Sequence, residues 1–150
     1  MLVAKFRHAS LNLAVAVCFS RILKIRKKIS KEEFLDSQEK IDSAKYNLIV
    51  VMEGACDICN HIAVKAGGQA PTSYADCFSI LEELKLLSTE LSTKLKLMAK
   101  FRNLLVHRYW KIDNGRVYDI IKQDIAAVSE YVKTVDSYIQ QESTKDKTTL

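Results

Sequence analysis

Apolar residues recur every three or four positions over most of the chain, which is the period of an amphipathic α-helix. The pattern is strongest over residues 41–66, where the apolar stripe consists of Ile41, Ala44, Leu48, Val51, Ala55, Cys59 and Ile62. Further apolar residues extend this surface beyond a single face, and a helix of that kind must be covered on more than one side. We therefore expect this helix at the centre of a bundle or against a second chain.

The same period predicts four more long helices. They cover about residues 9–28, residues 74–87, the segment from Ser88 or Thr89 into residues 102–107, and about residues 117–140. A short element is expected after Ser30, because Ser30 and Glu33 have the spacing of a capping box. Gly67-Gly68 is expected to end the central helix, and Asp113-Asn114-Gly115 is a strong turn signal.

The scarcity of chain-breaking residues supports an all-α fold. The 150 residues include one Pro and four Gly, whereas an all-β protein needs a turn every few residues. We expect an up-and-down bundle of about five helices in a single domain, residues 1–141. Residues 142–150 are a polar C-terminal tail that we expect to fray.

Charge and hydropathy indicate which partners and which cellular location to expect. The formal net charge is +5, which is compatible with a polyanionic partner but does not require one. Basic residues gather near residues 21–31 and 94–111 and would form a phosphate-tracking surface if both clusters faced the same way. The apolar run at residues 11–19 is too short to span a bilayer. We expect a cytoplasmic protein with no membrane partner.

The positions of the cysteines predict a role in core packing and not in metal binding. All four lie within apolar helical patterns and are expected to be reduced core residues: Cys18, Cys56, Cys59 and Cys77. Cys56 and Cys59 lie near His61, but a zinc site needs two further ligands, and the sequence has neither a second Cys pair nor a His pair. No metal or cofactor site is predicted, and no glycine-rich phosphate loop is present.

The candidate chemistry lies in residues 101–110, which contain Arg102, His107 and Tyr109. Arginine offers a planar donor fork for phosphate, and histidine titrates near neutrality. On an ideal helix Arg102 and His107 lie about 140° apart, whereas Tyr109 returns to within about 20° of Arg102. Asn103 shares a face with His107. Two copies of this helix meeting about a dyad could combine these groups in one groove.

A polar strip interrupts the apolar central helix. Glu53, Asp57 and His61 follow one another at intervals of four residues. They either support Arg102 or His107 in a cleft or form a structural hydrogen-bond network at a dimer seam. Because a buried carboxylate needs a partner, Arg102 is the natural one.

Four segments together resemble the HEPN superfamily, and specifically its HepT-like toxin branch. They are Arg102-Asn103-Leu104-Leu105-Val106-His107-Arg108-Tyr109, the Glu53–Ile62 segment with its Glu, Asp-Ile and Asn-His positions, Ser73-Tyr74-Ala75-Asp76 followed by Phe78 and Leu81, and Val117-Tyr118-Asp119-Ile120-Ile121. The resemblance covers about residues 34–138 in the family's order. Without it, a salt-bridged surface Arg102 beside a packed His107 would be the simpler interpretation.

The resemblance implies an all-helical homodimer that cleaves RNA without a metal ion or cofactor. Arg102 would bind the scissile phosphate and His107 would transfer the proton, with Asn103, Glu53 and Asp57 in support. The implied system is a type VII-like toxin–antitoxin pair, in which an MntA-type nucleotidyltransferase antitoxin adenylylates Tyr109. The phosphate added to Tyr109 would bring negative charge into the groove that must admit RNA.

Two interpretations compete with the nuclease. The protein could be a non-catalytic HEPN interaction or nucleotide-binding module that docks a nucleotidyltransferase, or a structural four-helix protein with an incidental motif. Tyr109 could likewise be a helix-end aromatic residue that packs against Trp110. The presence of Arg102, His107 and Tyr109 together favours the enzyme.

Overall fold

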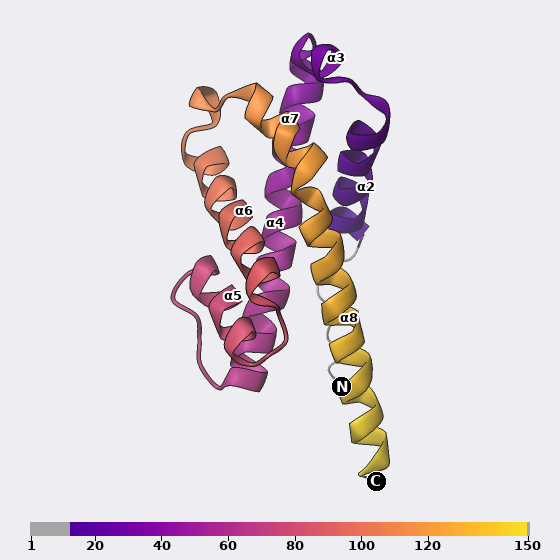
Figure 1. Cartoon of the computed structure of the whole chain (residues 1–150), viewed down its shortest axis with the longest axis vertical. Helices are drawn as coiled ribbons and strands as arrows, with labels where there is room; N and C mark the ends of the chain where they lie inside the picture. The colour runs from indigo at the N-terminus through magenta and orange to yellow at the C-terminus, as the bar shows by residue number, and fades with distance from the viewer. Residues whose placement is uncertain (1–12, 150) are drawn as a thin grey trace.

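The computed structural model describes residues 13–149, which contain seven α-helices, one 3₁₀ turn and no β-strand (Figure 1). The elements are α2 (Leu13–Lys28), α3 (Lys31–Leu35), α4 (Gln38–Gly67), α5 (Tyr74–Glu83), α6 (Thr89–His107), the 3₁₀ turn η1 (Tyr109–Lys111), α7 (Asn114–Gln123) and α8 (Ile125–Thr148). The predicted all-α bundle is confirmed. Residues 9–12 of the first predicted helix lie outside the described residues.

Helix α4 is the centre of the bundle, as its apolar surface predicts. It packs against α2 on one side and against α5 and α6 on the other (Figure 1). The stripe read from the sequence is buried in full: Ile41, Ala44, Leu48, Val51, Ala55, Cys59 and Ile62. Burial of such side chains against neighbouring helices is the main source of stability in a bundle.

The length and apolar character of α4 also match those of a membrane-crossing segment. An 18-residue window of this helix has a mean hydropathy of 1.3, but 56% of that window is buried inside the protein. A core helix meets the same criteria of length and composition. The packing of α4 against α2, α5 and α6 identifies it as such a helix.

Side-chain caps set most helix boundaries where the sequence predicts them. Ser30 accepts a hydrogen bond from the Glu33 amide at 3.2 Å, and the Glu33 carboxylate accepts one from the Ser30 amide at 3.0 Å, which completes the predicted capping box. Ser88 caps α6 in the same way. At the end of α4, Gly68 adopts a φ of +68°, a left-handed conformation that glycine accepts without strain.

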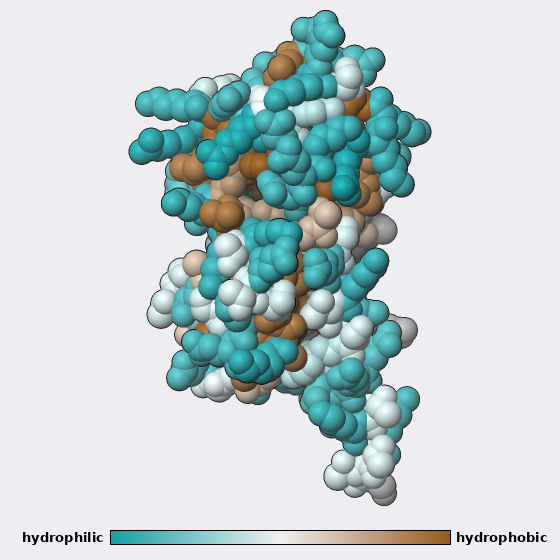
Figure 2. All heavy atoms as spheres, in the orientation of Figure 1, coloured by the Kyte–Doolittle hydropathy of each residue, from teal (hydrophilic) through white to brown (hydrophobic). Residues whose placement is uncertain are grey.

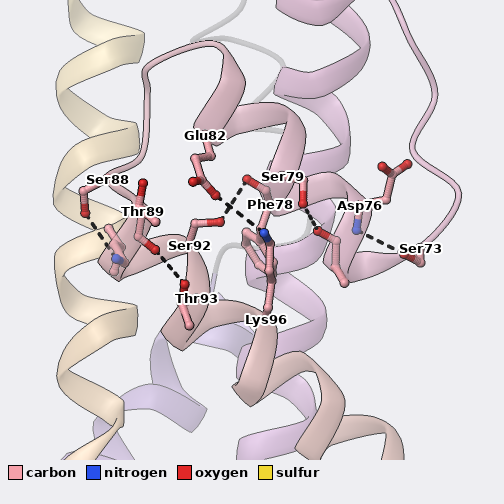
Figure 3. Close-up of polar contacts among 12 residues, drawn as sticks. Ser73, Asp76, Phe78, Ser79, Glu82, Ser88, Thr89, Ser92, Thr93 and Lys96 are labelled. Atoms are coloured by element: carbon pink, nitrogen blue, oxygen red, sulfur yellow. Dashed lines mark hydrogen bonds and ion pairs between the residues drawn. The ribbon is translucent and has the colours of Figure 1, made fainter.

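The α5–α6 hairpin holds α6, and with it the candidate motif, against the core (Figure 3). Ser92 is buried and its hydroxyl donates to the Phe78 carbonyl at 3.4 Å, while Lys96 pairs with Glu82 at 3.5 Å. Phe78 also meets the ring of Tyr131 from α8 edge to face at 5.8 Å. Helix α5 is shorter than predicted and ends at Glu83, because Lys85 adopts a φ of +62° in the connection to α6.

The last predicted helix, residues 117–140, is two helices. Asp113 does not form a simple turn; its carboxylate accepts a hydrogen bond from the Gly115 amide at 2.8 Å and caps α7. Asp124 separates α7 from α8, which lets α7 contact α2, α3 and α4 while α8 runs along α6. A single straight helix could not make both sets of contacts.

The polar residues from Glu142 onward, expected to fray, continue α8 as helix to Thr148. Lys145 pairs with Glu142 at 3.0 Å, and the Thr144 hydroxyl donates to the Gln140 carbonyl at 3.0 Å. Both contacts connect neighbouring turns of the helix. The terminal segment therefore extends α8 without adding to the core.

The four cysteines are buried and unpaired, as predicted. Loss of solvation on burial, with smaller contributions from Cys77 and other neighbours, raises the pKa of the Cys56 thiol to about 12. Hydrogen bonding with Cys77, followed by burial, also raises the pKa of Cys59. Thiols in this state are packing groups, since nucleophilic attack and metal binding require the thiolate.

Candidate active site

Arg102 lies on α6 where three helices meet. Its Nη2 donates to Glu53 Oε1 on α4, its Nη1 donates to the amide oxygen of neighbouring Asn103 at 3.0 Å, and its guanidinium lies over the Tyr74 ring of α5 at 5.3 Å from the centroid. Only 15% of the Arg102 side chain is exposed, against 46% for Glu53. The expected pairing of Arg102 with a carboxylate of the central helix is confirmed, and Glu53 is that carboxylate.

An open groove lies next to two residues that contact Arg102, although Arg102 itself is not among the residues that line it. It has a volume of about 380 Å³ and is lined by Asn60, Pro71, Thr72, Ser73, Tyr74 and Asn103. Tyr74 and Asn103 touch Arg102 as well as the groove. Each terminal nitrogen of a guanidinium carries two N–H donors, so the contacts to Glu53 and Asn103 leave one donor on each. Among the residues that the structure describes, the site therefore has a fixed cation with donors to spare, and Tyr74 and Asn103 connect it to a polar groove.

Asp57 and His61 do not join Arg102 directly. The Asp57 carboxylate is exposed and forms no hydrogen bond or ion pair with any residue in the described part of the chain. Partial desolvation, and secondarily the nearby Glu53 charge, raise its pKa. His61 is half-buried one turn further along α4. Of the predicted polar strip, only Glu53 holds the arginine.

His107 is the last residue of α6, and its side chain is exposed. Across residues 13–149, no hydrogen bond or ion pair to the imidazole is found. Asn103, which shares a face with His107 on an ideal helix, directs its amide oxygen to Arg102. One chain therefore presents a restrained arginine and a free histidine on different sides of the same helix, consistent with their separation of about 140°.

Tyr109 does not lie on α6, so its predicted alignment with Arg102 is wrong. The helix ends at His107, and Tyr109 begins the 3₁₀ turn η1. Its hydroxyl donates to Asp42 at 2.9 Å, while Lys45 donates to the Tyr109 carbonyl at 3.1 Å and lies 4.6 Å above the ring. Burial, followed by the hydrogen bond to Asp42 and its charge, raises the pKa of Tyr109 to about 12.

The sequence analysis did not identify the residues that hold Tyr109, nor the aromatic ring that lies against Arg102. Asp42 and Lys45 lie three residues apart on α4, and Tyr74 opens α5. One signal was available: Lys45, which is 4% exposed, lies within the long apolar pattern of the central helix. A lysine in such a place needs polar or aromatic partners, and Tyr109 supplies both.

A family model described as "Ribonuclease HepT-like" matches residues 16–135, which include every residue of this site. The chain belongs to the HepT-like ribonuclease family. The predicted resemblance is therefore confirmed. The match begins within α2 and ends within α8, so it spans the central helix and both helices that surround Arg102.

Two curated relatives of this HepT-like protein are named as nucleases. It is 30% identical over 118 residues to the tRNA nuclease HepT of Aphanizomenon flos-aquae, covering 78% of this chain and 80% of that protein. It is 29% identical over 94 residues to the mRNA nuclease HepT of Shewanella oneidensis, covering 63% of this chain and 71% of the relative. The names of these two relatives give different RNA targets.

The fold is also similar to that of a solved toxin–antitoxin complex. The tri-AMPylated HEPN toxin of Shewanella oneidensis, solved in complex with its MNT antitoxin, superposes with a TM-score of 0.74 at 26% identity. The similarity covers 83% of this chain and 92% of the toxin. The HEPN fold class predicted for the bundle is confirmed.

Proposed function

We propose that this HepT-like protein is a metal-independent endoribonuclease toxin in which Arg102 and His107 are the catalytic residues. The observation that carries the proposal is the setting of Arg102, whose guanidinium is fixed by Glu53 and Tyr74 beside an open polar groove. His107 lies five residues further along the same helix and is exposed. A fixed donor for phosphate and an accessible imidazole are the two groups that RNA cleavage by its own 2′-hydroxyl requires.

The reaction follows from these two groups. The neutral imidazole of His107 takes the proton of a ribose 2′-hydroxyl, whose oxygen attacks the adjacent phosphorus. The bond to the 5′-oxygen breaks, and that oxygen takes the proton from the His107 imidazolium, which returns to its neutral form. Arg102 stabilises the charge that develops on the phosphoryl oxygens. The products are a 2′,3′-cyclic phosphate and a 5′-hydroxyl, and DNA cannot react because it lacks the nucleophile.

The supporting residues act through Arg102. Glu53 holds the guanidinium against α4, and Asn103, which also lines the groove, accepts a hydrogen bond from Arg102 Nη1. Asp57 is one helical turn from Glu53 and adds negative charge to that strip. We assign Glu53 and Asn103 as positioning residues, and Asp57 as a weaker contributor through its charge.

A homodimer would bring His107 of one copy toward Arg102 of the other. The proposal is supported by large apolar side chains that stay exposed on α4 and α6, since Tyr46 is 61%, Val64 is 51% and Val106 is 45% exposed. On a helix, Tyr46 and Val64 lie within about 20° of Glu53, and Val106 lies within about 40° of Arg102. The uncovered apolar face therefore surrounds the ion pair, and a second copy would cover it.

The proposed regulator is an MntA-type nucleotidyltransferase antitoxin that adenylylates Tyr109. In that step the phenol oxygen attacks the α-phosphorus of ATP, pyrophosphate leaves, and the phenol proton must be accepted. Asp42 is hydrogen-bonded to that proton at 2.9 Å and is placed to accept it. The added phosphate would carry negative charge two residues from His107 and oppose the binding of RNA.

We expect this system to act in the cytoplasm on RNA and without a membrane partner. The burial of α4 within the bundle supports this, because the one helix of the described chain that is long and apolar enough to cross a membrane is already largely covered by protein.

The test is cleavage of end-labelled RNA by the purified full-length protein in EDTA, with His107→Ala prepared in parallel to exclude a contaminating nuclease. We expect cyclic-phosphate ends from the wild type only, and no cleavage of the matching 2′-deoxy strand. Inactive wild-type protein that carries no adenylyl group by intact mass would overturn the proposal. That result would favour a non-catalytic module that docks the nucleotidyltransferase.

A further inference from the structure

Trp110 is the most exposed large hydrophobic side chain among the described residues, at 90%. It lies in η1, three residues after His107. Nothing in the proposed cleavage chemistry uses it, and no helix of the described bundle covers it. Leu97 and Val132, which are also exposed on α6 and α8, are aliphatic and lack the flat π surface that stacks on nucleobases.

The indole is exposed and contacts the ring of its neighbour Tyr109. Its ring meets the Tyr109 ring edge to face, with centroids 5.3 Å apart and an angle of 77° between the planes. Tyr109 is itself tied to α4 by Asp42 and Lys45. An aromatic residue anchored through its neighbour loses little conformational freedom when a ligand stacks on its free face.

The charge around Trp110 is positive. From residue 100 to residue 116 the chain has five basic residues (Lys100, Arg102, Arg108, Lys111 and Arg116) and one acidic residue, Asp113. Asp113 is occupied as the cap of α7. Arg108 and Lys111, on either side of the Tyr109–Trp110 pair, are exposed and form no ion pair within the described residues. Figure 2 shows hydrophilic side chains extending from the surface where α6 passes into α7.

We propose that Trp110 is a base-stacking residue that holds one nucleobase of the RNA substrate, with Arg108 and Lys111 contacting the phosphates on either side. An exposed aromatic ring flanked by cations is the combination that binds single-stranded nucleic acid without strong sequence preference. Trp110 would then hold the strand close to His107. The inference rests on the proposed function, because it assigns a binding residue to the same substrate.

The chain offers a direct probe, because Trp110 is its only tryptophan. Oligouridylate RNA is titrated into the full-length His107→Ala protein, which binds without cleaving, and tryptophan emission is followed. Stacking predicts quenching. An abasic ribose-phosphate oligomer of equal length supplies the same charge without bases and should bind without quenching. Equal quenching by both oligomers, or binding of labelled RNA with no change in emission, overturns the proposal.

Substitutions give a second, kinetic test. Trp110→Ala should raise the KM for single-stranded RNA about tenfold, in line with the loss of one stacked base, and leave kcat within about twofold. Trp110→Phe keeps an aromatic face and should stay close to the wild type. Leu97→Ala, at an exposed apolar residue of α6, is the matched control, and thermal melting should be unchanged in all three variants.

The outcomes separate this inference from the proposed function. A wild-type protein that cleaves RNA while Trp110→Ala retains its KM would leave the nuclease intact and overturn the stacking role. In that case the indole is a protein contact, and adenylylation of Trp110→Ala by the antitoxin would be reduced. If neither the wild type nor any variant cleaves RNA, but quenching of the tryptophan emission still shows stacking, the proposed nuclease activity alone is overturned.

Discussion

The two catalytic candidates, five residues apart on one helix, differ in how firmly they are held. Arg102 is 15% exposed and is bound by Glu53, Asn103 and the Tyr74 ring. His107 is exposed at the end of α6 and has no hydrogen-bond partner within residues 13–149. The chain thus fixes the group that would bind phosphate and leaves the group that would move a proton without a restraining contact among the described residues.

The difference has a physical reason. A cation that stabilises charge in a transition state is most effective when its orientation is set before substrate arrives. A proton carrier must reach both the attacking and the leaving oxygen, and it needs access to solvent or to a second chain. The bundle core can supply only the first requirement, a preset orientation of the cation. The second requirement, access to solvent or to a second chain, is met only at the surface of the bundle.

The largest expected effect separates activity from stability. His107→Ala should lower the initial cleavage rate by a factor of about 10²–10⁴ and leave the thermal midpoint unchanged, because the imidazole is exposed and makes no packing contact that the fold needs. The initial rate is measured on labelled RNA, and the thermal midpoint is measured by circular dichroism. Lys133→Ala, an exposed cation on α8, is the control. A destabilised His107→Ala protein would show that His107 belongs to the core.

Arg102→Ala should lower both the cleavage rate and the stability of the fold. Loss of the phosphate ligand is expected to reduce the rate by a factor of about 10²–10³. The same change leaves Glu53 without its cation, which we expect to lower the free energy of unfolding by about 1 kcal/mol. Arg102→Lys keeps the charge but not the donor fork, so it should recover most of the stability and little of the rate. Full activity of Arg102→Ala would contradict the assignment.

Glu53 tests whether the orientation of Arg102 matters in addition to its charge. Glu53→Ala removes the carboxylate that holds the guanidinium, and we expect a decrease in kcat of about tenfold. Glu53→Gln retains a hydrogen-bond acceptor and should lose less. Asp57→Asn, one turn away and without a contact to Arg102, should stay within about twofold of the wild type. Equal losses for Asp57→Asn and Glu53→Ala would indicate a general effect of charge.

The sequence predicts what depends on local pattern. The central position of α4, the caps at Ser30 and Ser88 and the end of α4 at Gly68 follow from apolar period and capping chemistry, and the structure has them all. The pairing of Arg102 with a carboxylate of the central helix also follows, because a buried carboxylate needs a partner, and the structure shows that this carboxylate is Glu53. These predictions require no knowledge of how distant helices cross.

Long-range geometry is what local patterns could not supply. The period of residues 117–140 continues through Asp124, so only the packing of α7 and α8 on different neighbours shows the break. Tyr109 leaves α6 because its hydroxyl and carbonyl are held by α4, 67 and 64 residues earlier in the chain. The angular alignment of Tyr109 with Arg102 assumed a helix that tertiary contacts end at His107.

The smallest expected effect concerns Tyr109, which is as restrained as Arg102 although it lies beyond His107. Its pKa is raised to about 12 from an ordinary value of 10.0. A phenol that holds its proton more tightly in the folded state stabilises the fold below pH 10, and this contribution is lost as the pH rises from 10 to 12. Asp42→Asn should move the pKa part of the way back, since burial remains.

Phenolate absorbance measures that shift. The chain has six tyrosines, so the titration of Tyr109→Phe is subtracted from that of the parent protein and, in a second pair, from that of Asp42→Asn. A Tyr109 pKa that does not change in Asp42→Asn would show that burial alone raises it, and Asp42 would lose its assignment as the acceptor of the phenol proton. A lower Tyr109 pKa in Asp42→Asn would mean that the Asp42 carboxylate restrains Tyr109 before adenylylation. The same carboxylate would then be positioned to receive the phenol proton during adenylylation.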